Sequence, residues 1–192
     1  NRKESILSTR VRHASVNYVK TGFMKDGTLK AVDFKVYTNT GAYASSALNV
    51  SGAMSHKVFK AYKIDHMRFQ CQPVYTNTEI AGAMRGYGSP QVYFGWQRQM
   101  QKIADFLHMD MADLQMKNMV DPDSCDPIFH KPHGNSRPKD CLKRALELID
   151  YEACLKEQEA TRNQDIRIGV GLALGVHGNN CVGAHRDVTT PM

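Results

Sequence analysis

The fold of this chain turns on residues 82–107, which read GAMRGYGSPQVYFGWQRQMQKIADFL. Three glycines and a proline interrupt the first nine residues of this stretch, and apolar residues then recur at helical spacing. Ser89 is suited to cap a helix, and Pro90 to its first turn, where a missing N–H costs nothing. We therefore predict a glycine-rich turn that leads into an amphipathic helix. The predicted buried face consists of Val92, Trp96, Met100, Ile103 and Leu107.

Before this turn the sequence favours strands. Residues 11–24 and 29–38 flank Lys25-Asp26-Gly27, and Asp-Gly is a favoured hairpin turn because both positions tolerate positive φ. In the second strand Val32, Phe34 and Val36 share one face. A third strand is expected at about residues 64–75. Residues 41–59, uncharged as far as Ser55, predict a short helix or a packed loop.

After the turn the sequence favours helices. A short helix is predicted from Asp110, with Met111 and Leu114 inward, and residues 121–139 form a long proline-rich connection. A further helix is predicted from about Lys139, and residues 166–177 predict a glycine-interrupted strand. The inward face of that further helix is expected to hold Leu142, Ala145, Leu146 and Ile149.

Strands followed by helices predict an α+β fold, a two-layer α/β sandwich with antiparallel strands, and argue against a doubly wound parallel sheet. The expected organisation is mainly strands in residues 1–81, a glycine and arginine loop at 82–91 and mainly helices in 92–165. Residues 166–192 are expected to begin a strand that leads into a part beyond Met192. Together with the first residue, which is Asn1, this pattern is typical of an internal fragment of a longer protein.

Composition narrows the class of protein. The chain has 192 residues, 42% of them apolar and 23% charged, which is typical of a folded domain and excludes disordered, collagen-like and disulfide-scaffold classes. The net charge of +6 permits anionic ligands. Basic residues are dispersed among acids, so nucleic acid is not an expected partner. The longest uncharged run carries many polar residues, so no membrane segment is expected.

Cysteines and histidines give no metal or nucleophile motif. The five cysteines include no C-x-x-C pair, which argues against a zinc ribbon and a disulfide framework and favours a reducing cytoplasm. Neither H-E-x-x-H nor G-x-S-x-G is present, so no metal ligands and no nucleophile are predicted.

The glycine-rich turn is the candidate site. Gly82, Gly86 and Gly88 allow close approach to the backbone, Arg85 supplies a fixed cation, and a helix N-terminus follows, which together predict an anion site. The alternative is a tight turn in which Arg85 pairs with an acid. The pattern is neither a P-loop nor a dinucleotide fingerprint. Tyr87 could stack on an aromatic substrate or simply anchor the loop.

Motifs spread along the chain support a more specific interpretation. The most specific is RGYGSPQ at residues 85–91, between a strand and an amphipathic helix. The others are Arg12-His13, Lys20-Thr21-Gly22, Lys25-Asp26-Gly27-Thr28-Leu29, Asn39-Thr40-Gly41-Ala42-Tyr43, Tyr62-Lys63-Ile64, Thr76-Asn77, Gly82-Ala83-Met84 and Lys117-Asn118. With these motifs the sequence resembles the molybdenum-binding subunit of the xanthine dehydrogenase and aldehyde oxidase family over nearly its whole length.

This resemblance implies an oxidoreductase that carries molybdenum on molybdopterin or its dinucleotide form. Iron–sulfur clusters and FAD then lie elsewhere in the complex, in partner subunits or domains. Ala83, Met84, Arg85 and Gly86 are implied to bind the cofactor, with Arg85 beside the molybdenum ligands as the catalytic candidate. Tyr87 is implied to line the substrate cavity, and Gln91 to shape the loop. No residue of this chain is implied as a metal ligand.

Two departures from the family pattern bear on activity. Ala53 stands where xanthine-type enzymes have a substrate-orienting arginine, nine residues before Tyr62. The family's general-base glutamate belongs to a later segment, so the fragment alone is expected to be inactive. The expected substrate is a purine or other N-heterocycle, and an aldehyde or aromatic thioester is the alternative. A non-catalytic domain that binds an anion or a partner, or an assembly protein without metal, stays open as well.

Overall fold

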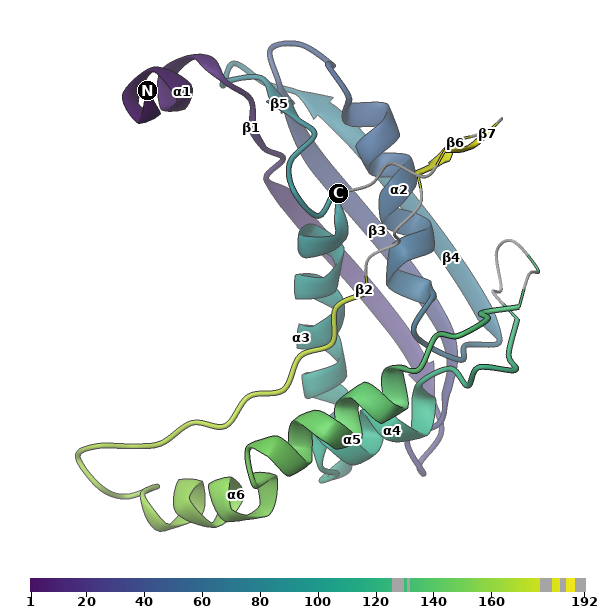
Figure 1. Ribbon diagram of the computed structural model, residues 1–192, viewed down its shortest axis with the longest axis vertical. Coiled ribbons are helices and arrows are strands. Elements are labelled where there is room, and N and C mark those ends of the chain that lie inside the picture. The colour runs from purple at the N-terminus through teal and green to yellow at the C-terminus, as the bar shows by residue number, and fades with distance from the viewer. Residues whose placement is uncertain (126–129, 131, 177–180, 184–185, 189–192) are drawn as a thin grey trace.

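The computed structural model describes residues 1–125, 130, 132–176, 181–183 and 186–188, and its centre is a three-stranded sheet (Figure 1). Strands β2 (Ser15–Phe23) and β3 (Leu29–Gly41) pair antiparallel, which confirms the predicted hairpin. Gly27 takes a φ of 85°, and the Thr28 N–H donates to Asp26 Oδ1 at 3.0 Å. The turn therefore forms where the Asp-Gly pair predicted it.

The third strand differs from the expected arrangement. Strand β4 (His66–Tyr75) pairs parallel with β3, so the expectation of antiparallel strands throughout is wrong and the sheet is mixed. The reason is α2 (Ala47–Phe59), which forms the helix in the stretch expected to be helix or loop. A helical crossover returns the chain to the same end of the sheet, and parallel pairing follows from that return.

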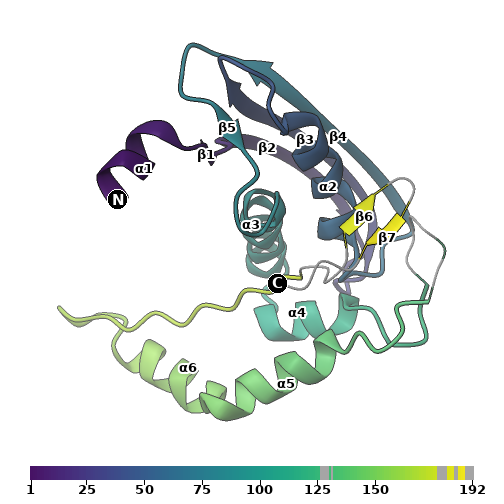
Figure 2. The same cartoon turned by 45° about the horizontal axis from the view of Figure 1, so that its top comes forward.

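Helices α2 and α3 (Ser89–Leu107) cover one face of the sheet, which gives the predicted α+β arrangement of two layers (Figure 2). The predicted stripe of α3 is buried, with Trp96 and Met100 inaccessible, although Leu107 is only half-buried. Gly88 occupies the cap position with a φ of 91°, and Ser89 is the first helical residue. The prediction that Ser89 caps this helix is therefore wrong, because a left-handed backbone at the cap favours glycine.

The first residues of the chain form a short helix and a short strand. That strand pairs with the strand that precedes the glycine-rich turn. Helix α1 (Arg2–Ser8) precedes strand β1 (Val11–Arg12), which pairs parallel with β5 (Ala81–Gly82). In this pairing Val11 lies opposite Ala81 and Arg12 opposite Gly82. The pairing brings residues 11 and 12 beside the glycine-rich turn.

Helix α4 (Met111–Asn118) begins as predicted, with Asp110 as its cap and with Met111 and Leu114 buried. Its last residue, Asn118, joins the helix to the hairpin. The Asn118 side chain donates to the Gly27 carbonyl and accepts from the Leu29 N–H, both at 2.9 Å. Because all of these groups are buried, the amide satisfies main-chain groups that water does not reach.

Helices α5 (Pro138–Leu148) and α6 (Tyr151–Ala160) form an arm that extends from the sheet and helix layers (Figure 2). Of the expected inward face of α5 only Leu142 is buried, whereas Ala145 and Ile149 are exposed. The prediction of a full inward face is wrong because α5 has few neighbours in this part of the chain.

Residues 166–176 contain no strand, so the predicted strand is wrong over this range, and His177 lies outside the described residues. Ile166 is 81% exposed, and among the described residues no strand pairs with this segment. Strands β6 (Cys181–Gly183) and β7 (Arg186–Val188) pair with each other. In the described part of the chain, no helix combines the length and apolar character needed to cross a membrane.

Candidate functional site

The glycine-rich turn forms a loop, residues 83–88, between β5 and α3. Ala83, Met84 and Arg85 are exposed, Gly86 and Tyr87 are half-buried, and Gly88 is buried. The Ala83 N–H donates to Ser46 Oγ at 3.0 Å, which fixes the start of the loop to the segment before α2. The predicted cofactor residues therefore lie together on one accessible loop.

The backbone of this loop has an unusual shape. Gly86, Tyr87 and Gly88 have consecutive positive φ values of 93°, 42° and 91°. A Cβ on Gly86 would lie 2.8 Å from Pro90 Cδ, so this position also requires glycine for space. At Tyr87 a left-handed backbone costs a non-glycine residue about 1–2 kcal/mol. Surrounding contacts have to stabilise the loop against this cost.

Two cations from distant parts of the chain provide those contacts. Arg12 Nη2 donates to the Arg85 carbonyl at 2.6 Å. Lys57 Nζ donates to the carbonyls of Gly86 and Tyr87 at 3.1 and 2.7 Å. Three successive carbonyls are thus held by positive charges. We call Arg12 and Lys57 the cation clamp.

The sequence alone does not reveal the cation clamp. Arg12 belongs to one of the family motifs, and Lys57 lies in none of them. Lys57 is only 8% exposed and lies on α2. A lysine in a mostly uncharged helix is the one signal that could have drawn attention to it, since lysine is rarely buried without a partner.

Unlike the carbonyls, several main-chain N–H groups of the loop are unpaired among the described residues. Among the described residues, the main-chain N–H groups of Met84, Arg85 and Gly86 have no hydrogen-bond partner. The Arg85 guanidinium likewise makes no ion pair or hydrogen bond with any described side chain. The alternative in which Arg85 pairs with an acid is therefore wrong for the described residues. Successive unpaired N–H groups beside an arginine suit an anionic or strongly polar ligand.

The side chain of Tyr87 also helps to hold the loop in place. Its ring packs against the hydrophobic core, and Lys57 Nζ lies 5.2 Å from the ring centre. That distance is within range for a favourable interaction between a cation and an aromatic face. The ring therefore anchors the loop, as one of the two predictions for it stated.

A buried tyrosine supports the clamp from α3. Tyr93 donates its hydroxyl hydrogen to the Lys57 carbonyl at 2.8 Å, and burial raises the pKa of Tyr93. The phenol thus stays protonated and remains a donor. Within the ranges that the structure describes, no three His, Cys, Asp or Glu side chains gather in a way that could hold a metal ion. The loop and the clamp are thus the candidate site.

Comparison with known proteins identifies the family. Residues 1–119 match the family model described as the molybdopterin cofactor-binding domain. The chain belongs to this family. A putative xanthine dehydrogenase molybdenum-binding subunit, XdhA, of Escherichia coli K12 is 32% identical over 94% of this chain, which corresponds to 24% of that protein. The aldehyde oxidoreductase of Megalodesulfovibrio gigas is 30% identical over 86% of this chain and 18% of that protein.

A solved structure agrees with this molybdopterin-binding assignment. The aldehyde oxidoreductase from Desulfovibrio gigas superposes with a TM-score of 0.73 at 28% identity, over 83% of this chain and 17% of that chain. The family resemblance derived from the sequence motifs is thus confirmed. The chain spans about a quarter or less of the length of these relatives. The matched residues 1–119 include the loop and both residues of the cation clamp.

Proposed function

We propose that the chain is part of a molybdenum hydroxylase similar to xanthine dehydrogenase. The reaction is the oxidation of a purine or other N-heterocycle, with water as the source of oxygen. The observation that carries this proposal is the loop at residues 83–88, in which carbonyls are held by the cation clamp while amide groups and Arg85 are left available. This polarity matches the electron-rich oxygen and sulfur groups of a molybdopterin.

Ala83, Met84, Arg85 and Gly86 would hold the cofactor, which is molybdopterin or its dinucleotide form. When bound, the group supplies the oxygen and electron transfer, and the protein supplies position and electrostatics. Arg85 would stabilise negative charge that develops near the metal. The unpaired N–H groups of the loop would donate hydrogen bonds to the cofactor. Iron–sulfur and FAD subunits or domains are the proposed partners, which receive the electrons.

Tyr87 is the proposed substrate-facing residue, since it follows Arg85 closely and is only half-buried. An N-heterocycle is favoured by the likeness to xanthine dehydrogenase subunits. An aldehyde is the alternative substrate, supported by the likeness to aldehyde oxidoreductases. Ala53, half-buried on α2, leaves no arginine at the position that orients purines in xanthine-type enzymes.

The test is elemental analysis of the full-length protein, purified with its companion subunits from cells grown with molybdate. We expect close to one molybdenum per large subunit, together with dye reduction that depends on a purine or an aldehyde. The substrate that supports reduction decides between the two classes. A well-folded preparation without molybdenum would contradict the proposal and favour a binding or assembly role.

A further inference from the structure

Strand β2 lies at the edge of the central sheet. The order of strands is β2-β3-β4, and within the described residues no strand pairs with the outer side of β2. An open edge presents main-chain N–H and C=O groups that can pair with another extended chain. Helix α3 runs beside this edge (Figure 1). Side chains of the two elements line a space between them.

That space is a groove of about 850 Å³. Its wall on the sheet side consists of six successive residues, 15–20, of β2. Successive residues of a strand point to opposite faces, so a groove that contacts all of them follows the strand edge itself. The opposite wall is one face of α3, from Pro90 to Lys102. We call this feature the β2–α3 groove.

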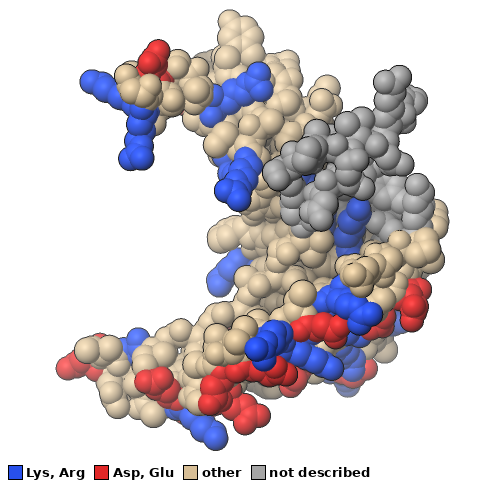
Figure 3. Space-filling model, in the orientation of Figure 1, with Lys and Arg blue, Asp and Glu red and all other residues tan. Residues whose placement is uncertain are grey.

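The charged side chains that line the β2–α3 groove are all basic. Its lining contains Arg12, Lys20, Arg98 and Lys102 and no aspartate or glutamate. Arg98 and Lys102 make no ion pair with another described residue. By contrast, most acidic side chains visible in Figure 3 gather over the α5 and α6 arm. The groove therefore attracts acidic groups from another molecule.

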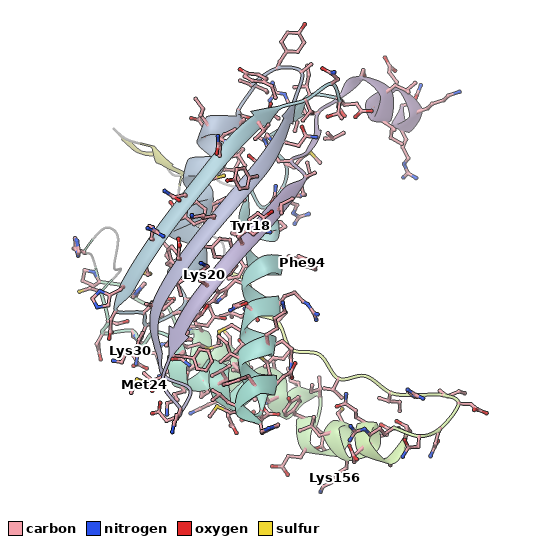
Figure 4. The ribbon with its side chains drawn as sticks, turned by 180° about the vertical axis from the view of Figure 1, so that it is seen from behind. Tyr18, Lys20, Met24, Lys30, Phe94 and Lys156 are labelled. Carbon is pink, nitrogen blue, oxygen red and sulfur yellow. The ribbon has the colours of Figure 1, made fainter. Side chains whose placement is uncertain are left out.

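Apolar side chains stand along the same groove. Tyr18 on β2 and Phe94 on α3 are 59% and 72% exposed, and they project from the neighbouring elements that form its walls (Figure 4). Val16 adds a third accessible apolar side chain, 55% exposed. An added strand brings apolar side chains to such a surface.

We propose that the β2–α3 groove binds an extended, acidic segment of a partner protein, which adds a strand to the edge of β2. Main-chain hydrogen bonds to β2 supply the pairing. Acidic side chains on the helix side of the segment meet Arg98 and Lys102, and the alternate apolar side chains contact Val16 and Tyr18 on the outer face of the sheet. Charge complementarity selects this occupant over a neutral or basic segment.

The test uses the full-length protein and a labelled octapeptide that alternates valine and glutamate, with binding followed by fluorescence anisotropy. We expect the peptide to bind, to lose affinity as salt is added, and to slow hydrogen exchange at residues 15–20. The double variant Arg98→Glu, Lys102→Glu should weaken binding by about tenfold or more. The double variant Lys143→Glu, Lys156→Glu on α5 and the distant α6 is the matched control, because it makes the same change of charge outside the groove (Figure 4). Thermal unfolding of each variant verifies that the fold is intact.

Several outcomes would overturn this proposal. These are no binding of the acidic peptide, equal binding of a valine and lysine peptide, or equal binding of an oligothymidylate of the same charge. Protection from exchange, in the peptide-free full-length protein, of those amides of residues 15–20 that do not donate to β3 would mean that its own polypeptide fills the groove. The measurements do not depend on bound molybdenum, so their failure leaves the proposed molybdenum hydroxylase untouched.

Discussion

Lys57 holds Tyr87 by two different contacts of the same ammonium group. Its Nζ donates a hydrogen bond of 2.7 Å to the Tyr87 carbonyl and lies 5.2 Å from the centre of the Tyr87 ring. Backbone and side chain of one residue are therefore fixed by one cation on a neighbouring helix. The positive φ of Tyr87 is maintained by this arrangement rather than by the local sequence.

Replacement of Lys57 by methionine should loosen the loop. Two carbonyls lose a charged donor, and such hydrogen bonds contribute about 1.5–3 kcal/mol each. Hydrogen exchange at the bonded amides of Tyr87 and Ser89 reports on the loop, and we expect it to accelerate at least tenfold. Lys35→Met is the matched control, because Lys35 is exposed on the outer face of the sheet. Equal exchange in both variants would contradict the clamp.

Replacement of Arg85 by alanine should lower turnover in the full-length enzyme. A missing cation near developing charge costs a factor of about ten to a thousand in rate. Because the Arg85 side chain has no ion pair among the described residues, the thermal stability of the protein should stay unchanged. Steady-state kinetics together with molybdenum content measure the effect. Normal turnover in a folded Arg85→Ala protein would exclude Arg85 from the site.

Replacement of Tyr87 by alanine should change substrate preference while molybdenum is retained. The comparison is the ratio of kcat/KM for a purine and for an aldehyde. Tyr87→Phe is the control, since it keeps the ring and its contact with Lys57. Loss of molybdenum from Tyr87→Ala would instead assign the ring a purely structural role.

Two glycines should respond oppositely to alanine. A Cβ on Gly95 of α3 would lie 2.9 Å from Asn17 Cβ on β2, whereas a Cβ on Gly52 of α2 would meet nothing within 4 Å. Gly52→Ala should raise the free energy of unfolding by about 0.5–1 kcal/mol through helix propensity. Gly95→Ala should lower it by about 1–3 kcal/mol because the helix must move from the strand. Chemical denaturation of each variant, monitored by the fluorescence of Trp96, measures the two free energies of unfolding.

Asp26 in the hairpin should make stability depend on pH in acid. Its hydrogen bonds with Lys117 and Thr28 lower the pKa of Asp26 from 3.8 to about 2. A folded pKa below the unfolded one means that ionised Asp26 stabilises the fold above pH 3.8, and that this contribution is lost as the pH falls towards 2. Urea midpoints across this range should therefore fall less steeply for Asp26→Asn than for the original chain. Asp165→Asn, at an exposed position, should leave the slope unchanged.

Local features of the chain could be predicted, and long-range features could not. The Asp26-Gly27 turn and the stripe on α3 follow from patterns within a few residues, so both were confirmed. The parallel pairing of β4 depends on the crossover through α2, which no local pattern specifies. Residues 166–176 have an apolar and glycine pattern typical of a strand, yet a strand also needs a partner, and the described residues provide none.

The same distinction between local and long-range features applies to the candidate site. Arg85 and the glycines stand in one short motif, so the loop could be located from sequence alone. The cation clamp could not, because Arg12 and Lys57 lie 73 and 30 residues from the carbonyls they bind. Such contacts appear only once the strands and helices are assembled.

The separation of Arg12 from Arg85 also has a consequence for the order of folding. Contacts between residues so far apart form late, because closing a long stretch of chain costs entropy until the sheet is in place. The loop at residues 83–88 is therefore expected to take its shape after the sheet has formed. A cofactor that binds this loop would then meet a chain whose sheet has already formed. In limited proteolysis of the cofactor-free protein, this loop should therefore be cleaved no faster than other segments of similar exposure.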